Sequence, residues 1–287
     1  MNSVVVNGSR LVYDRVGCGA DLVLVHGLGA NRAFWRLTVV PLLSRQFTVT
    51  SYDLRGHGLS DVSPRGYTTR DMADDLAELL EAAGIRSAHV VGHSFGGAVA
   101  LHHAVRRPQQ VRSLVLADAR IAAFERPVRL RDWSYWPEWK RKIRDAGGPV
   151  PDANRVIDHR LMRDLARPEW RTAGRALASH GIFLPASSGK GRHSTATMLD
   201  RLLETTTAPS DTRAVAGLDA ASVAMMTRPT LALYGEYSHC LRSMAGLRDH
   251  LPDCTSKVIP RVGHFFPAVM PGPFAREVSS FVEARAC

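Results

Sequence analysis

The stretch from residue 90 to residue 97, Val-Val-Gly-His-Ser-Phe-Gly-Gly, constrains the fold more than any other part of the chain. Gly92 and Gly96 lie two residues either side of Ser94, between an apolar run that predicts a buried strand and an alanine-rich run, residues 98–107, that predicts a helix. A serine on a sharp strand-to-helix turn has a strained backbone, and neighbours without a Cβ let the strand and the helix approach each other. The pattern therefore predicts a turn that exposes the Ser94 hydroxyl.

Two further glycine-containing motifs also follow expected strands. Residues 26–29, His-Gly-Leu-Gly, come directly after the apolar run 21–25. Residues 53–60, Asp-Leu-Arg-Gly-His-Gly-Leu-Ser, come directly after the run 47–52. An apolar strand that enters a His-Gly-x-Gly turn lets a backbone amide point into a site.

These three motifs, in this order and at these separations, resemble those of the α/β-hydrolase superfamily. The resemblance is close over residues 1–120 and looser over 228–287. It implies an α/β fold, with a doubly wound, mostly parallel, eight-stranded sheet, helices on both faces and a site at the carboxyl ends of the strands. The eight expected strands are residues 4–6, 11–16, 21–25, 47–52, 88–91, 113–117, 229–235 and 256–260.

The regular alternation of strands and helices stops near residue 120 and resumes near residue 229. In the superfamily, an insertion after the sixth strand is usually a helical cap over the site. We therefore expect a core in two parts, residues 1–119 and 229–287, with a cap formed by 120–228. Within the cap, the Ser-Ser-Gly-Lys-Gly sequence in 184–194 predicts a loop.

Serine alone is a poor nucleophile at neutral pH, so a base must remove its proton. The resemblance implies that this base is His264, which lies in a Gly-His turn after the last expected strand. It also implies that the backbone amides of Leu28 and Phe95 form the oxyanion hole. His26 in the oxyanion loop and His93 in the serine turn are expected beside the substrate pocket.

At the position of the acid, this chain departs from the pattern of the superfamily that it resembles. The usual Gly-x-x-Asp after the seventh strand is here Gly-Glu-Tyr-Ser, which ends in Ser238. Asp118, directly after the sixth strand, occupies an alternative acid position that haloalkane dehalogenases and some polyketide-releasing thioesterases use. Glu236 is a second candidate, and a third interpretation is that the acid is lost and the protein is weak or inactive. We favour Asp118.

The predicted cap contains large aromatic side chains and an excess of positive charge. Trp133, Trp136 and Trp139 either form the core of the cap or line an apolar acyl pocket, and we include Trp133 and Trp136 among the pocket candidates. Residues 120–228 contain 19 Lys or Arg and 12 Asp or Glu, so this segment carries +7 of the chain's net charge of +10. This excess favours a solvated arginine-rich surface, with docking of an acidic carrier protein that bears a thioester substrate as the alternative. No nucleic-acid motif is present.

The four cysteines, Cys18, Cys240, Cys254 and Cys287, lack metal or redox spacing, which predicts reduced thiols. The sequence contains no run of eighteen apolar residues. Its first residues do not resemble a signal peptide. We therefore expect a cytoplasmic protein without membrane contact, metal or organic cofactor.

These observations predict a serine hydrolase that cleaves a small acyl ester, thioester or lactone through an acyl-enzyme on Ser94. A serine at this position disfavours the branches of the family with an aspartate nucleophile, which open epoxides or remove halide. The alternatives are a C–C hydrolase, lyase or cyclase of the same fold, or a binding protein without turnover.

Overall fold

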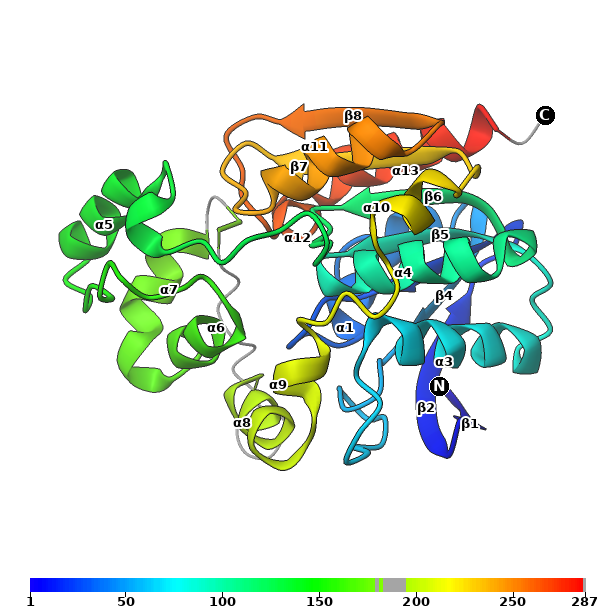
Figure 1. Cartoon of the computed structure of the whole chain (residues 1–287), viewed down its shortest axis with the longest axis horizontal. Coiled ribbons are helices and arrows are strands. Elements are labelled where there is room, and N and C mark those ends of the chain that lie inside the picture. Colours follow the sequence, from blue (N-terminus) through cyan, green and yellow to red (C-terminus); the bar gives the residue numbers. More distant parts are fainter. Residues whose placement is uncertain (179–180, 183–194, 286–287) are drawn as a thin grey trace.

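A computed structural model describes residues 1–178, 181–182 and 195–285 (Figure 1). The predicted loop in 184–194 lies outside the described residues. Eight strands form one sheet: β1 (Asn2–Val6), β2 (Ser9–Val16), β3 (Ala20–Val25), β4 (Phe47–Tyr52), β5 (Ala88–His93), β6 (Val111–Ala117), β7 (Thr230–Gly235) and β8 (Cys254–Ile259). Each coincides with an expected strand to within a few residues.

The strand order is β1-β2-β4-β3-β5-β6-β7-β8, and only the pairs β1–β2 and β2–β4 are antiparallel. The strands from β4 to β8 run parallel, so their carboxyl ends meet at one edge of the sheet. The central strand β5 is buried along its whole length, as its continuous apolar sequence predicts. The prediction of a mostly parallel, eight-stranded, doubly wound sheet is confirmed.

Helices cover both faces of the sheet and create two apolar cores. One face carries α3 (Thr69–Ala82), α4 (Phe95–Arg106), α10 (Ala220–Ala224) and α11 (Leu241–His250). The other face carries α1 (Ala33–Arg36), α2 (Val40–Leu43), α12 (Phe266–Val269) and α13 (Pro271–Glu283). This two-sided cover is why the parallel strands have apolar residues on both faces.

The helix α3 shows how local sequence sets an element that supports the site. Thr68 caps it and forms a reciprocal capping box with Asp71, which satisfies two amides of the first turn. Met72, Leu76 and Leu80 recur at helical spacing and are fully buried against the sheet. The sequence predicts this helix over 70–83, one residue from the observed bounds at each end.

The chain between β6 and β7 contains the helical insertion, which lies beside the carboxyl ends of the strands (Figure 1). Its helices are α5 (Trp136–Asp145), α6 (His159–Leu165), α7 (Arg171–Ala178), α8 (Thr195–Thr205) and α9 (Ala208–Asp211). Short 3₁₀ turns at Leu130–Asp132 and Pro168–Trp170 precede α5 and α7. The predicted helical insertion after the sixth strand is therefore confirmed.

The insertion has an apolar core of its own. Trp133 and Trp136 each pack edge to face against Trp139, and all three are less than a tenth exposed. Pro137 lies in the first turn of α5, where its missing amide costs no hydrogen bond, so the helix begins at Trp136 and leaves Trp133 outside it. Among the described residues, no helix is long and apolar enough to cross a membrane.

The serine turn depends on the absence of a side chain at Gly96, near the start of α4. A Cβ there would lie 2.2 Å from the carbonyl oxygen of His26 and 2.6 Å from that of Val25. Both atoms belong to the backbone where β3 ends, so neither can rotate away. Gly96 thus allows α4 to contact the neighbouring strand.

We predict that Gly96→Ala lowers the free energy of unfolding by on the order of 2 kcal/mol, because overpacking forces the backbone apart. Denaturant unfolding followed by circular dichroism measures this change. The matched control is Gly272→Ala in α13, where a Cβ meets only the mobile end of Arg276 at 3.7 Å. A Gly96→Ala midpoint equal to that of the control would show that the close approach is not limiting.

Candidate active site

Ser94 occupies the turn between β5 and α4 in a conformation that non-glycine residues rarely adopt, with φ 55° and ψ −123°. The turn is held from two directions. The Ser94 amide donates to the carbonyl of Ala117 in β6 (3.0 Å), and the Ser94 carbonyl accepts from the amides of Gly97 (3.0 Å) and Arg120 (3.2 Å). These bonds offset the backbone strain and fix where the hydroxyl points.

His264 lies in the turn after β8 and contacts the serine directly. Its Nε2 is 2.9 Å from Ser94 Oγ, and its Nδ1 is 2.8 Å from Asp118 Oδ1. With Asp118 ionised, Nδ1–H donates to the carboxylate and Nε2 is left to accept the serine proton. The structure therefore brings together the three residues that the sequence proposes as nucleophile, base and acid, from turns after three different strands.

Asp118 is fully buried and is held by the loop that lacks the usual acid. The Gly235 amide donates to Oδ2 at 2.9 Å, and the Ser238 hydroxyl donates to Oδ1. Like Ser94, Asp118 has a positive φ, 49°, and its own amide donates to the carbonyl of Leu233 in β7 at 2.7 Å. A carboxylate on β6 is thus bound by donors from the end of β7.

Ser238 is the residue whose role sequence reasoning misses. From the sequence it marks only a missing acid, yet its hydroxyl donates to Asp118 and accepts from the Cys240 amide at 2.9 Å. A pattern search for catalytic residue types does not find it, because its function depends on a carboxylate 120 positions earlier in the chain.

The electrostatics of this group favour the state that a general base needs. Burial raises the pKa of Asp118 to about 6, and the hydrogen bonds from Ser238 and Gly235 oppose that rise. Burial, followed by the positive charge of Arg120, lowers the pKa of His264 below its ordinary value. At neutral pH the carboxyl is therefore ionised and the imidazole is neutral.

The alternative acid, Glu236, binds other partners. Its carboxylate accepts from the Arg261 amide at 2.7 Å and from the Tyr135 hydroxyl at 3.2 Å, so it joins the turn after β8 to the cap. None of its hydrogen bonds goes to His264, whose Nδ1 is bonded to Asp118. The geometry thus gives the acid position to Asp118 and leaves Glu236 a structural contact.

The predicted oxyanion donors lie in two turns beside Ser94. The Gly27 carbonyl accepts from the Ala30 amide at 3.1 Å, and Gly29 has φ 79°, which makes residues 27–30 a type II turn with Leu28 at its corner. Phe95 is the first residue of α4, so its amide has no partner within the helix. Among the hydrogen bonds of the described residues, neither the Leu28 nor the Phe95 amide is a donor.

Two histidines hold this oxyanion loop in place. His26 is fully buried, with Nδ1 2.9 Å from the Gly27 carbonyl and Nε2 accepting from the Leu54 amide at 3.0 Å. His57 Nε2 accepts from the Gly29 amide at 3.2 Å. Because both nitrogens of His26 are used inside the protein, it supports the loop and does not line the pocket as expected.

A cavity of about 470 Å³ opens above Ser94, between the sheet and the cap. Ser94, His264, His93 and Leu28 line it together with residues from both sides of the insertion. His93 is nearly buried, and its Nε2 donates to the His264 carbonyl at 2.8 Å, so it positions the base as well as lining the cavity. This placement agrees with the expectation for His93.

The two tryptophans predicted for the pocket differ in where they lie. Trp133 lines a smaller, mostly apolar cavity beneath the cap, which reaches His264 and His239. Trp136 lines neither cavity, because it packs inside the core of the cap. The structure therefore places Trp136 against Trp139, which matches the alternative that these tryptophans form the core of the cap.

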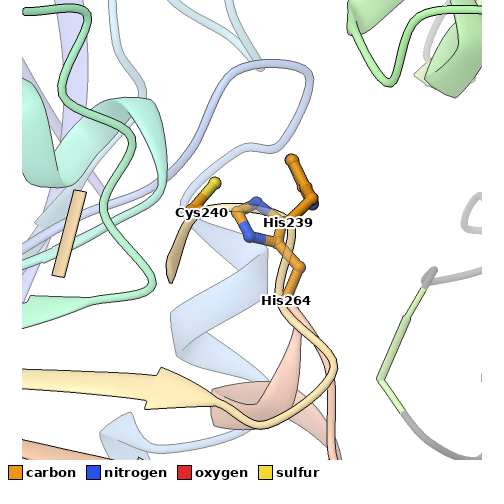
Figure 2. Close-up of side chains that lie close together, drawn as sticks. All are labelled: His239, Cys240 and His264. Carbon is orange, nitrogen blue, oxygen red and sulfur yellow. The ribbon is translucent and has the colours of Figure 1, made fainter. Parts of the chain in front are cut away.

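Figure 2 shows three metal-ligating types of side chain that lie close together. A nitrogen of His239, the sulfur of Cys240 and a nitrogen of His264 lie within 4.8 Å of one another. Both nitrogens of His264 are already hydrogen-bonded, and burial raises the pKa of the Cys240 thiol well above its ordinary value of 9.0. A metal needs a free imidazole nitrogen and a thiolate, so this group does not fit a resident ion.

Comparison with known proteins gives consistent matches. A family model described as the alpha/beta hydrolase fold matches residues 22–269. A soluble epoxide hydrolase of Corynebacterium sp. strain C12 is 38% identical over 117 residues, which are 41% of this chain and 41% of that protein. The chain covers 30%, 41% and 40% of the lengths of three curated relatives, so these similarities span less than half of each relative.

Solved structures match over nearly the whole chain. Est816, described as an N-acyl homoserine lactone degrading enzyme, superimposes with a TM-score of 0.70 at 21% identity, over 98% of this chain and 100% of that one. A thermophilic esterase from Thermogutta terrifontis superimposes with a TM-score of 0.64 at 22% identity, over 100% and 99% of the two chains. At these identities the likeness is one of fold.

The pKa of Asp118 predicts how the reactivity of Ser94 depends on pH. Activation of Ser94 needs an ionised Asp118 and a neutral His264, and binding of a proton to either residue removes that state. The raised pKa of Asp118, about 6, places the first loss there, so phosphonylation of Ser94 by a fluorophosphonate should slow as pH falls through about 6. Labelling rates measured from pH 4 to 9 test this, and a rate independent of pH across that range would contradict it.

The hydroxyl of Ser238 should influence the pH at which Ser94 loses its reactivity. Its hydrogen bond stabilises the ionised carboxylate, so Ser238→Ala should raise the pKa of Asp118 and move the acid limb of labelling to higher pH. Glu236→Gln is the matched control from the same loop, since its partners are Arg261 and Tyr135, and it should leave the limb in place. Equal shifts in the two variants would disprove a specific role for Ser238.

Proposed function

Because the chain belongs to the alpha/beta hydrolase fold family, we propose that it is a serine hydrolase that cleaves a small acyl ester, thioester or lactone through an acyl-enzyme on Ser94. The observation that supports this most is the continuous chain of hydrogen bonds from Ser94 Oγ through both nitrogens of His264 to Asp118. This arrangement suits acyl transfer because it activates a hydroxyl and stabilises the imidazolium that forms.

In the proposed acylation, Ser94 Oγ attacks the carbonyl carbon while His264 Nε2 takes its proton. Negative charge develops on the carbonyl oxygen and is stabilised by the amides of Leu28 and Phe95, which donate to none of the described residues. The tetrahedral intermediate then collapses and the carbon–oxygen or carbon–sulfur bond breaks. The leaving group takes the proton from His264, so charge and protons balance.

In the proposed deacylation, a water molecule enters the cavity and gives a proton to His264 as it attacks the acyl carbon. The bond to Ser94 Oγ breaks, Ser94 regains the proton, and the carboxylic acid product leaves. Asp118 keeps its negative charge throughout and holds His264 in the tautomer whose Nε2 faces the serine.

The likeness to solved structures and the identity of the residue in the turn both support ester-type chemistry. Solved structures of the same fold include proteins described as an esterase and as a lactone-degrading enzyme. The partly matched epoxide hydrolase points elsewhere, but a serine in the turn gives an acyl-enzyme and does not suit the aspartate-based opening of an epoxide.

Two alternatives keep the same geometry. A C–C hydrolase, lyase or cyclase would use Ser94 and His264 on a different bond, and a binding protein would use the cavity without turnover. Covalent labelling of Ser94 by a fluorophosphonate excludes the binding protein. Product analysis with matched ester and β-diketone substrates separates ester cleavage from C–C cleavage.

An acidic carrier protein as the donor of the acyl group remains part of the proposal. Aspartates in the cap pair with four of its arginines, Arg155, Arg163, Arg167 and Arg213. These pairs leave the net charge of the insertion unchanged, because its 12 acidic residues are already set against its 19 basic ones. Faster turnover of a carrier-bound thioester than of its small mimic, lost at high salt, would support docking.

Substitutions at the site test the covalent mechanism. Ser94→Ala should abolish turnover of para-nitrophenyl butyrate and the acyl-enzyme mass adduct, and Asp118→Asn should lower turnover by on the order of a thousandfold or more. Glu236→Gln serves as the matched carboxylate-to-amide control and should have a far smaller effect. Residual turnover of Ser94→Ala within a few-fold of wild type would refute the proposal.

A further inference from the structure

Arg120 is a charged residue in the cavity that the proposed mechanism does not use. It follows Asp118 by two positions, and its amide donates to the Ser94 carbonyl at 3.2 Å, so its backbone is fixed beside the nucleophile. The residue is half-buried and lines the same cavity as Ser94 and His264. Its position is therefore set by the same strand ends that build the site.

The Arg120 guanidinium has no hydrogen bond or ion pair with any residue in the described part of the chain. Glu125 lines the same cavity, but its carboxylate accepts from the amide and the hydroxyl of Ser243, at 3.0 Å and 2.7 Å. The charge of Arg120 acts on Glu125 from beyond ion-pair distance, where it opposes the rise that burial causes in the pKa of Glu125. A ligand carboxylate could therefore accept hydrogen bonds from a guanidinium that donates none to the described residues.

The rest of the cavity adds to the positive potential. Arg126, Arg160 and Arg213 also line it, but all three are exposed, and Arg213 pairs with Asp158 at 2.9 Å. With Glu125 and Asp158 as the acidic residues among the described lining, the four arginines leave an excess of two positive charges. Arg120 is the one among these arginines that combines partial burial with attachment to the nucleophile turn.

We propose that Arg120 binds a carboxylate of the substrate, so that the enzyme acts on esters, thioesters or lactones that carry a carboxylate close to the scissile carbonyl. This inference rests on the proposed hydrolase function and specifies its substrate class. The planar guanidinium matches a carboxylate through two parallel hydrogen bonds, which gives orientation as well as binding. A cavity of about 470 Å³ is of a size for such a small molecule.

The same contact should assist the chemical step. Burial, followed by the positive charge of Arg120, lowers the pKa of His264, so Arg120 disfavours the imidazolium that forms there during the reaction. A bound carboxylate offsets this charge, so substrates that carry one should gain in kcat as well as in KM. An arginine that only supports the fold would not produce this difference between substrates.

The experiment uses two pairs of neutral and carboxylate substrates of matched shape. In the first pair the carboxylate is on the acyl side: the para-nitrophenyl monoester of glutaric acid and its isopropyl-terminated isostere. In the second it is on the leaving group: para-butyryloxybenzoate and para-isopropylphenyl butyrate. The ratio of kcat/KM within each pair measures carboxylate preference, and the pair with the larger ratio shows on which side the anion binds.

Wild type should prefer the carboxylate ester in one pair by about tenfold or more, and Arg120→Gln should reduce that ratio by about tenfold, with Arg120→Lys between the two. Arg126→Gln is the matched control, an exposed arginine of the same cavity. Thermal unfolding of each variant checks that the fold is intact.

The outcomes separate the two proposals. If neither the wild type nor any variant hydrolyses any of the four esters, the proposed hydrolase function itself is wrong. If wild type hydrolyses them without carboxylate preference, or if Arg120→Gln keeps the preference, the function stands and the role of Arg120 is overturned. An equal loss in Arg126→Gln would also overturn it, because a diffuse positive field would then be sufficient.

Discussion

The site depends on one buried interaction, the hydrogen bond between Asp118 and His264. A fully buried carboxylate is costly unless donors surround it, and here the donors come from the end of β7 as the Gly235 amide and the Ser238 hydroxyl. These contacts tie β6, β7 and the turn after β8 together at the carboxyl edge of the sheet. A carboxylate at the end of β6 is thus surrounded by the loop after β7.

The same backbone arrangement occurs after two neighbouring strands of the sheet. Ser94 follows β5 and donates its amide to β6, and Asp118 follows β6 and donates its amide to β7. Both have a positive φ, and the residues before them, His93 and Ala117, are paired in the parallel register. The nucleophile and the acid therefore leave adjacent strands at the same level, which places both beside one imidazole.

The core and the insertion have different physical tasks. The core positions reacting groups through backbone hydrogen bonds, and these tolerate little change because a Cβ at Gly96 meets backbone on β3. The insertion packs mainly on its own tryptophans and closes the cavity from above. Changes in the residues that face the cavity can alter the substrate without disturbing the bonds that activate Ser94, which is how one fold supports many activities.

The sequence by itself determined the sheet, the serine turn and the candidates Ser94, His264 and Asp118, because strand periodicity and glycine spacing are local properties. It left open whether Asp118 or Glu236 meets the histidine, because that depends on which side chain crosses between strands far apart in the chain. It left open whether the cap tryptophans form a core or line the pocket, and it placed His26 beside the pocket, since composition does not reveal which way a side chain faces. Only the tertiary structure placed the Ser238 hydroxyl on Asp118 and showed that the Arg120 guanidinium pairs with none of the described residues, because both follow from contacts between distant segments.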